Sequence, residues 1–519
     1  MNIVRRGAWP LSIFLLALLP RLIDLGTRPF WLDEVFTLNR ASLAPAALVQ
    51  DSFQNHHMPS FFLLLSPLVQ LGHPEFWLRF PSAVFGALSV VLVFVIASRI
   101  GGRLAGVLAA LIIGLSPTAL AFSQEARSYT LEMTLILVGL YGLIQLAQDL
   151  PGAAGPMMRG QARAGWLAFI LGTTGAVDVL GDGLPWLLTA NIIFLCLLPF
   201  TPDRKRFAGN FLCADIIVAV LCAPLYVLMS HYQSSSPLDA MMWIPPLNIS
   251  RLWYNLGSVY LMRLADSVTF HFMKEATPGL IVWLIDAVLL AAVATAAWRL
   301  RRRPVILALL GISLVFLPAL FIITSLWRPI LLPRYILWSA APFAILAGIG
   351  AAALLDACTP RLRVAAVAAA TALLLFNVAP YYHAETKPRW DIAARMLAQE
   401  VEPGDVVYLY DLGALSILRV YLPPGTQTVV LNDSKGDLTH AQVAMSQGKR
   451  VWAVYGHAGQ SGGTGEMQKF YAKAQVLGTP KIMQTAGSRI FIALFDPATA
   501  HLAQNCTVQP LGHSPSGCS

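Results

Sequence analysis

The chain has 519 residues, of which 56% are hydrophobic and only 12% are charged, and its formal net charge is +9. This composition favours a polytopic membrane protein over a soluble globular one. The positive charge lies largely in short loops, and no soluble basic patch interleaved with aromatic residues is present, so we expect no nucleic-acid partner.

Taken in chain order, the apolar runs predict about eleven transmembrane helices, each near the roughly 20 residues that a bilayer core requires. They lie near 8–25, 76–98, 104–122, 127–147, 165–181, 184–200, 210–230, 279–298, 305–326, 334–355 and 364–380. The first run resembles a signal sequence, but no small-residue cleavage site follows it. We therefore interpret it as an uncleaved first helix.

Basic residues mark every second connection between these runs. After Arg5 and Arg6 they are Arg99 and Arg103, Arg159 and Arg163, Arg204 to Arg206, Arg299 to Arg303, and Arg361 and Arg363. Because basic residues collect on the cytoplasmic side, the remaining connections are predicted to face outward. An odd number of spans also places the polar tail, 381–519, outside the cytoplasm.

Two outward segments, 26–75 and 231–278, are too long to be turns and are predicted to be part of a transmembrane domain that covers 1–380. The first contains the apolar run 59–71, which is too short to cross a bilayer as a helix and is expected to lie along the membrane surface or dip into it. The second is rich in tyrosine and tryptophan, as is typical of a membrane interface.

The tail, 381–519, changes to short elements of alternating type, which predicts a small α/β domain. Helices are expected at 390–400, 415–421, 439–447 and 465–474, and strands at 406–410, 428–431, 451–455 and 489–495. Beyond 497 the Pro/Gly/Ser-rich end is expected to be loosely ordered. Cys506 and Cys518 are the two cysteines on the outward side, so we expect a disulfide between them.

Charged and polar residues gather at the outward ends of the predicted spans. They are Asp33 and Glu34, the run His56 to Pro59, Arg79, the run Ser123 to Tyr129, and Pro333 to Tyr335. An arginine at a span end, such as Arg79, can also extend into the headgroups. Two adjacent acids gain nothing at an anionic lipid surface, so Asp33 and Glu34 are the stronger functional candidates.

Four acids lie inside predicted spans, where ionisable residues are functional candidates by default. They are Glu132, Asp178, Asp215 and Asp286. Asp178 and Asp215 lie near span ends and can reach water there. Asp286 has no partner that the sequence identifies.

The order of these outward motifs resembles bacterial glycosyltransferase family 39 and its relatives, which include protein O-mannosyltransferases and the lipid A aminoarabinose transferase. The motifs are Trp31-Leu32-Asp33-Glu34, His57-Met58-Pro59, Arg79-Phe80-Pro81-Ser82, Ser116-Pro117, Ser123 to Tyr129, and Arg334-Tyr335. Met58 stands where the family commonly has a second proline. The resemblance covers roughly 21–150 and returns at Arg334-Tyr335.

The resemblance implies a GT-C membrane fold and the transfer of a sugar from a polyprenyl-phosphate donor to an acceptor hydroxyl on a lipid, glycan or protein. It also implies a bacterial inner-membrane protein with a periplasmic C-terminal domain. Such a reaction needs a carboxylate base for the hydroxyl, and we assign that role to Asp33. The phosphate leaving group needs fixed positive charge, for which Arg127 and Arg334 are the candidates.

Other residues of the motifs have supporting roles in this interpretation. Glu34 and Glu125 are candidates to orient the acceptor or the sugar, and Glu125 can also hold Arg127 or a divalent ion. Tyr129 and Tyr335 line the sugar or the phosphate, or serve only as interfacial anchors. His57 hydrogen-bonds the carrier phosphate, or makes only a structural contact. A metal held by His56, Asp33 and Glu125 has no supporting ligand spacing, and no cofactor is required.

Other classes of protein stay open at this stage. A secondary transporter would bind its substrate at the membrane midplane in repeated halves with broken helices, and the sequence shows no repeat. A noncatalytic assembly or export subunit would use the tail and loops as a scaffold. An oligosaccharide ligase or polymerase would share the GT-C architecture and a lipid-linked donor.

The predicted topology can be tested with reporter fusions. Alkaline phosphatase fused after Ser519 should be active, because the odd number of spans places the tail outside. A fusion after Arg303, in a predicted cytoplasmic loop, serves as the inactive control. An active cytoplasmic reporter at the C-terminus would mean that a span was miscounted.

Overall fold

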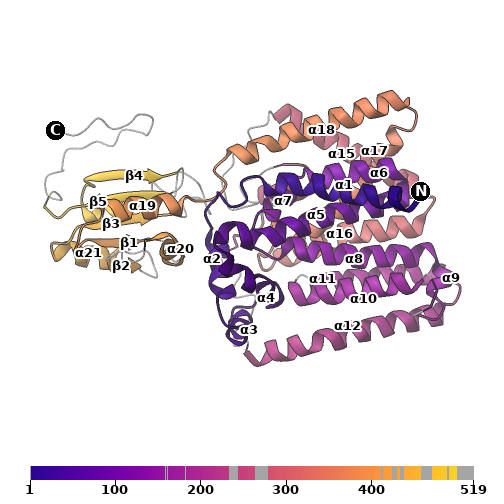
Figure 1. Cartoon of the computed structure of the whole chain (residues 1–519), viewed down its shortest axis with the longest axis horizontal. Coiled ribbons are helices and arrows are strands. Elements are labelled where there is room, and N and C mark those ends of the chain that lie inside the picture. Colours follow the sequence, from indigo (N-terminus) through magenta and orange to yellow (C-terminus); the bar gives the residue numbers. More distant parts are fainter. Residues whose placement is uncertain are drawn as a thin grey trace. The chain divides into compact units, whose positions relative to one another are not determined.

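The computed structural model describes residues 2–157, 159–160, 162–181, 183–232, 244–263, 279–410, 413–423, 429–432, 438–456, 470, 472–487 and 490–498. They form two compact units (Figure 1). The first consists of Met1–Arg28 and Asp33–Thr386, and the second of Pro29–Leu32 and Lys387–Ser519. Cys506, Cys518, the tail after 498 and most of the predicted helix 465–474 lie outside the described residues.

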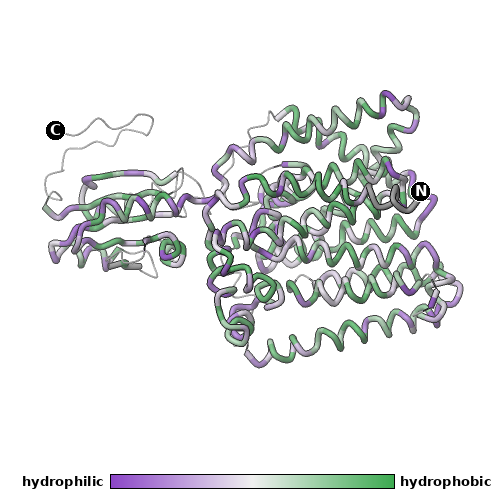
Figure 2. Tube along the Cα trace, in the orientation of Figure 1, coloured by the Kyte–Doolittle hydropathy of each residue, from purple (hydrophilic) through white to green (hydrophobic). Residues whose placement is uncertain are grey.

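The first unit is a bundle of long helices with apolar middles and more polar ends (Figure 2). In chain order the long helices are α1 (Asn2–Leu22), α5 (Pro74–Gly101), α6 (Arg103–Gly114), α8 (Tyr129–Gln148), α10 (Ala162–Val179), α11 (Gly183–Leu197), α12 (Arg204–Tyr232), α15 (Gly279–Leu300), α16 (Pro304–Ser325), α17 (Ala340–Leu354) and α18 (Pro360–His383). The shorter elements are α2 (Leu32–Ala41), α3 (Pro45–Gln54), α4 (Ser60–Leu65), η1 (Ser66–Leu71), α7 (Pro117–Ser123), α9 (Leu150–Ala153), η2 (Leu198–Phe200), α13 (Ile249–Tyr260) and η4 (Pro333–Ser339).

Each of the eleven predicted spans coincides with one of these helices or with two consecutive ones. In the described residues, eight helices are long and apolar enough to cross a membrane, and the bent pair α6 and α7 makes a ninth if it counts as one span. The apolar part of α1, Trp9–Leu22, is shorter than this standard. The chain is thus a multi-pass membrane protein, and eleven spans remain a prediction.

The arginine-rich connections lie together at one end of the bundle. Arg303 donates a hydrogen bond to the carbonyl of Ile100, and Arg299 forms an ion pair of 2.9 Å with Asp356. At the same end, Arg103 lies over the ring of Trp9. Helices α2, α3 and α4 lie at the opposite end (Figure 1). The predicted alternation of basic and non-basic loops therefore corresponds to two chemically distinct ends.

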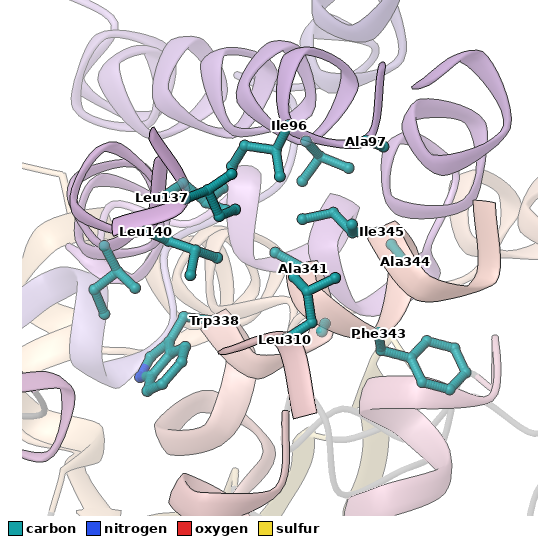
Figure 3. Packing of buried hydrophobic residues seen from close by; sticks show 14 of the residues in the cluster. Ile96, Ala97, Leu137, Leu140, Leu310, Trp338, Ala341, Phe343, Ala344 and Ile345 are labelled. Carbon is teal, nitrogen blue, oxygen red and sulfur yellow. The ribbon is translucent and has the colours of Figure 1, made fainter. Parts of the chain in front are cut away.

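Close packing of helices forms the core of this unit. Figure 3 shows Ile96, Leu137, Leu140, Trp338 and Ile345 packed together from helices distant in the sequence. Helices α8 and α10 approach particularly closely, because a Cβ added at Gly172 would lie only 2.4 Å from the backbone nitrogen of Gly139. Small residues at such contacts let membrane helices gain van der Waals contact along their backbones.

One predicted boundary, the domain limit at 380, differs from the structure. The apolar run 59–71 forms α4 and η1, which together are too short for a span, as predicted. Helix α18, however, continues past the predicted domain limit at 380. The hydroxyls of Tyr381 and Tyr382 donate to Gln124 Oε1 and to the carbonyl of Pro20, so this last turn is fixed to the bundle.

The second unit contains a five-stranded mixed sheet in the order β2-β1-β3-β5-β4. The strands are β1 (Val406–Leu409), β2 (Val429–Asn432), β3 (Val451–Tyr455), β4 (Ile482–Ala486) and β5 (Ile490–Phe495), with helices α19 (Trp390–Glu400), α20 (Ala414–Tyr421), α21 (Thr439–Ser446) and η5 (Gln475–Leu477). Strand β1 pairs in parallel with β2 and β3, whereas β5 pairs antiparallel with β3 and β4.

Four of these strands and three helices match the predicted elements, and β4 was missed. Strands β1, β3 and β5 are buried along their whole length, so their sequences are continuous apolar runs that hydropathy can identify. Strand β4 is an edge strand with alternating exposure, and its polar Gln484 and Thr485 interrupt the apolar pattern. Residues Pro29–Leu32 also belong to this unit, where the backbone N–H of Phe30 donates to the hydroxyl of Tyr421 at 2.6 Å.

Candidate active site

Helix α2 carries the two acids of the first outward segment and directs them to different surroundings. Consecutive residues of an α-helix point about 100° apart. The side chain of Glu34 has no exposed surface, whereas that of Asp33 is 23% exposed. Both lie in the first turn, where the helix dipole favours negative charge. Of the pair, Asp33 is the one that a substrate can reach.

Glu34 forms a buried ion pair with Arg79 of α5. Arg79 Nε donates to Glu34 Oε1 at 2.7 Å, and Nη2 donates to Oε2 at 2.8 Å. The Nη1 group of Arg79 donates to the carbonyls of Leu25 and Arg28, and the backbone N–H of Ala126 donates to Glu34 Oε1 at 2.9 Å. Arg79 is 1% exposed and does not extend into headgroups. The pair buries Glu34 within the protein, and the substrate contact predicted for Glu34 stays a prediction.

Asp33 lies among cationic and phenolic side chains that come from distant parts of the chain. Arg334 Nη1 donates to Asp33 Oδ2 at 3.0 Å, and Arg127 is close enough to interact electrostatically with both residues. Arg127 lies 5.8 Å from the ring centre of Tyr129, and Arg334 lies 5.2 Å from that of Tyr335. The structure thus brings together five residues that the sequence identified separately.

His57 lies beside this cluster as a neutral side chain. Burial lowers the pKa of His57 well below its usual value, and the charges of Arg127, Arg40 and Arg334 lower it further. An imidazole in these surroundings is uncharged at neutral pH and can donate or accept one hydrogen bond. Arg40, which the sequence did not identify, is held by Asp51 at 2.6 Å.

Glu125 lies on the loop between α7 and α8 and is 1% exposed. It interacts electrostatically with Tyr381, whose hydroxyl donates to Gln124 Oε1 at 2.8 Å. Arg28 lies 4.7 Å from the ring centre of Tyr381 and donates to its carbonyl. Glu125 is therefore buried near Tyr381, and its predicted contact with a substrate stays a prediction.

The charge of the cluster suits an anion. Arg40, Arg127 and Arg334 outnumber Asp33 and Asp51. In the described part of the chain, no three His, Cys, Asp or Glu side chains gather in a way that could hold a metal ion. The proposed metal set of His56, Asp33 and Glu125 gains no support from this geometry.

The structure also supplies a partner for Asp286, which the sequence left unexplained. Arg263, within the second outward segment, donates from Nε and Nη2 to Asp286 Oδ2 at 2.9 and 2.8 Å. The guanidinium lies 5.1 Å from the ring centre of Trp253 and 4.4 Å from that of Trp283. Asp286 therefore anchors the segment after α13 to helix α15.

No family model matches the sequence, and no curated protein matches it. Solved structures of ArnT from Cupriavidus metallidurans are similar in fold. The apo form has a TM-score of 0.55 at 14% identity, with 96% of this chain and 99% of ArnT covered. The form bound to undecaprenyl phosphate has a TM-score of 0.56 at 15% identity, with 97% and 99% covered.

The archaeal oligosaccharyltransferase AglB from Archaeoglobus fulgidus, in complex with an inhibitory peptide and a dolichol-phosphate, is also similar. Its TM-score is 0.53 at 13% identity, with 91% of this chain and 71% of AglB covered. The predicted GT-C fold is therefore confirmed over nearly the whole chain.

We predict that Glu34→Gln strongly destabilises the protein. The change leaves the buried Arg79 without its counter-charge, and breaking a buried pair in this way costs about 3–5 kcal/mol. The midpoint of thermal unfolding in detergent should fall, and the double variant Glu34→Gln/Arg79→Gln should recover part of the loss. Asp24→Asn, a change at an exposed acid, is the control. An unchanged midpoint for Glu34→Gln would show that the pair does not support the fold.

Proposed function

We propose that the chain is a glycosyltransferase that moves a sugar from a polyprenyl-phosphate-linked donor to an acceptor hydroxyl, on the extracytoplasmic face of a bacterial inner membrane. The observation that carries the proposal is the partly exposed carboxylate of Asp33, held at 3.0 Å by Arg334 beside Arg127. This arrangement combines a proton acceptor with fixed positive charge, which are the two requirements of the reaction.

Asp33 acts as the general base in the proposed mechanism. Its Oδ2 atom is held by Arg334, and no other side chain of the described residues bonds Oδ1, so this oxygen can accept the proton of an acceptor hydroxyl. The hydroxyl oxygen then forms a bond to the anomeric carbon of the sugar. The bond from that carbon to the phosphate oxygen breaks, and its electron pair leaves with the lipid phosphate.

Arg334 and Arg127 stabilise the leaving group. A donor phosphodiester carries one negative charge, and the departing phosphate monoester carries a second as the glycosidic bond breaks. Fixed cations next to that oxygen therefore interact more strongly with the transition state than with the bound donor, which accelerates the reaction. Because a guanidinium presents a planar pair of donors, it can hold two phosphate oxygens at once.

The remaining residues complete the site. Tyr129 and Tyr335 lie against the two arginines and can donate to the phosphate or to sugar hydroxyls. Neutral His57 can donate one hydrogen bond to the same phosphate. Glu34 and Glu125 act through the backbone and the side chains that they hold in place. The reaction as proposed requires no metal.

The fold supports this class of reaction. The structure of ArnT with undecaprenyl phosphate and that of AglB with a dolichol-phosphate each contain a polyprenyl phosphate. The candidate residues lie at helix ends and not at the middle of the bundle, whereas a secondary transporter binds at the midplane. The likeness to AglB makes transfer of a lipid-linked oligosaccharide the second candidate function.

The activity can be tested directly with purified protein in detergent or nanodiscs. Incubation with a panel of polyprenyl-phosphate monosaccharides and lipid-linked oligosaccharides, with lipid, glycan and peptide acceptors, should release the lipid phosphate for one donor class. Release from a monosaccharide donor supports the first proposal, and release only from oligosaccharide donors supports the second.

Asp33→Asn should abolish transfer and leave donor binding and folding intact. The amide keeps the shape of the side chain but cannot accept the proton, a loss of about 10²- to 10⁴-fold in rate. The exposed acid in Asp24→Asn is the matched control and should retain full activity. Transfer by Asp33→Asn above about a tenth of the wild-type rate would exclude Asp33 as the base.

Arg334→Ala and Arg127→Ala should each weaken donor binding. A hydrogen bond to a charged group contributes about 1.5–3 kcal/mol, so affinity for polyprenyl phosphate should fall about ten- to hundredfold. Lysine at either position should restore only part of the affinity, because its ammonium group lacks the planar pair of donors of a guanidinium. Arg328→Ala, at an exposed arginine near η4, is the control. Unchanged affinity in both alanine variants would assign these arginines to a structural role.

A further inference from the structure

The segment that carries Arg334 and Tyr335 has an unusual local structure. Helix η4 is a 3₁₀ helix of seven residues, Pro333–Ser339. Runs of 3₁₀ helix longer than three or four residues are uncommon, because their hydrogen bonds have poorer geometry than those of an α-helix. Arg334 and Tyr335 lie in its first turn. Their positions therefore depend on contacts from outside the segment.

Helix α13 supplies such contacts on both sides of η4. Before η4, Asn255 Nδ2 donates to the carbonyl of Leu331 at 3.4 Å. At the end of η4, the hydroxyl of Tyr260 and Oγ of Ser339 form a hydrogen bond of 2.6 Å. Ser339 Oγ also lies 2.5 Å from the carbonyl of Ile336, so the bond from Tyr260 extends into the backbone of η4.

Helix α13 is itself anchored to three other helices of the bundle. The hydroxyl of Thr118 in α7 donates to the carbonyl of Ser258. Asn377 of α18 donates to the carbonyl of Met262 at 2.9 Å, and Arg263 pairs with Asp286 of α15. Met262 has a φ of 50°, a left-handed conformation that a methionine adopts at a cost. The sharp turn after α13 is thus held by hydrogen bonds on both of its sides.

The two faces of α13 differ in burial. Asn255, Ser258 and Val259 are buried against the bundle, whereas Ile249, Trp253 and Tyr254 are exposed. Asn255 contacts the chain before η4 through a buried hydrogen bond, and the hydrogen bond between Tyr260 and Ser339 is partly buried. A hydrogen bond that is shielded from water contributes more to fixing a geometry.

We propose that α13 is a brace that fixes Arg334 for the donor phosphate, with Tyr260 as the positioning residue that acts through Ser339 and the backbone of η4. This inference rests on the proposed function. A site that must stabilise charge in a transition state needs its donors fixed in advance, and a 3₁₀ segment alone does not provide that rigidity.

The test compares Tyr260→Phe with Tyr254→Phe. The first change removes the hydroxyl that reaches Ser339, and the second removes an exposed hydroxyl on the same helix. Tyr260→Phe should raise the KM for the polyprenyl-phosphate donor about three- to tenfold, the range expected for one hydrogen bond, and leave the KM for the acceptor unchanged. Tyr254→Phe should match the wild type in both constants.

A second measurement is independent of catalysis. Amide hydrogen exchange of 333–339 should be faster in Tyr260→Phe than in the wild type, because the segment loses its outside support. Ser339→Ala should speed exchange at least as much, because it also removes the hydrogen bond from Ser339 to the carbonyl of Ile336. The double variant should be no worse than Ser339→Ala, which already lacks the bond to Tyr260.

The two readouts separate the inference from the proposed function. If neither the amide exchange of 333–339 nor the donor KM changes in Tyr260→Phe, α13 does not fix Arg334 through Tyr260. If exchange is faster in Tyr260→Phe but the wild-type protein transfers no sugar from any donor, α13 does support η4 and the proposed function is wrong. An equal rise in the KM of donor and acceptor would show that α13 stabilises the unit generally and does not position Arg334.

Discussion

The buried ion pair between Glu34 and Arg79 is the interaction on which the geometry of the site depends. Taking two charges out of water is costly. The cost is offset here because Arg79 donates to both carboxylate oxygens of Glu34 and to the carbonyls of Leu25 and Arg28, and Glu34 also accepts from the backbone N–H of Ala126. These bonds join α2, α5, the chain before α2 and the loop before α8. Because Asp33 is the next residue on the same helical turn, fixing Glu34 also fixes the direction of Asp33.

The cluster around Asp33 contains more arginines than acids, and their charges also affect the free energy of the site. Like charges held together cost free energy in the empty site, and Arg40, Arg127 and Arg334 also lower the pKa of His57. In the proposed reaction, a donor phosphate relieves that repulsion when it binds. The arginines are already in place, so they need no rearrangement as the glycosidic bond of the proposed donor breaks, and this favours the transition state.

Hydropathy predicted much of the bundle, because apolar runs and basic loops are properties of contiguous sequence. The motifs also located Asp33, Arg127 and Arg334 individually. The pairings could not be predicted, since Arg79 is 45 residues from Glu34 and Arg334 is 301 residues from Asp33. Hydropathy likewise provided no reason to separate two adjacent acids, one buried and one partly exposed, or to connect Asp286 with an arginine in a long outward loop.

The candidate residues lie where regular helix stops, and membrane physics explains the surrounding polar network. Backbone groups freed by a break need protein partners in a bilayer. At the break between α6 and α7, Arg21 donates to the carbonyl of Gly114 and to Ser123 Oγ. In the loop that follows, Gln124 donates to the carbonyls of Arg21 and Ile23. Arg127 lies in that same loop before α8, and Arg334 lies in the 3₁₀ helix η4, so both arginines lie outside regular α-helix. The buried polar residues that satisfy the loop before α8 are therefore part of what positions Arg127.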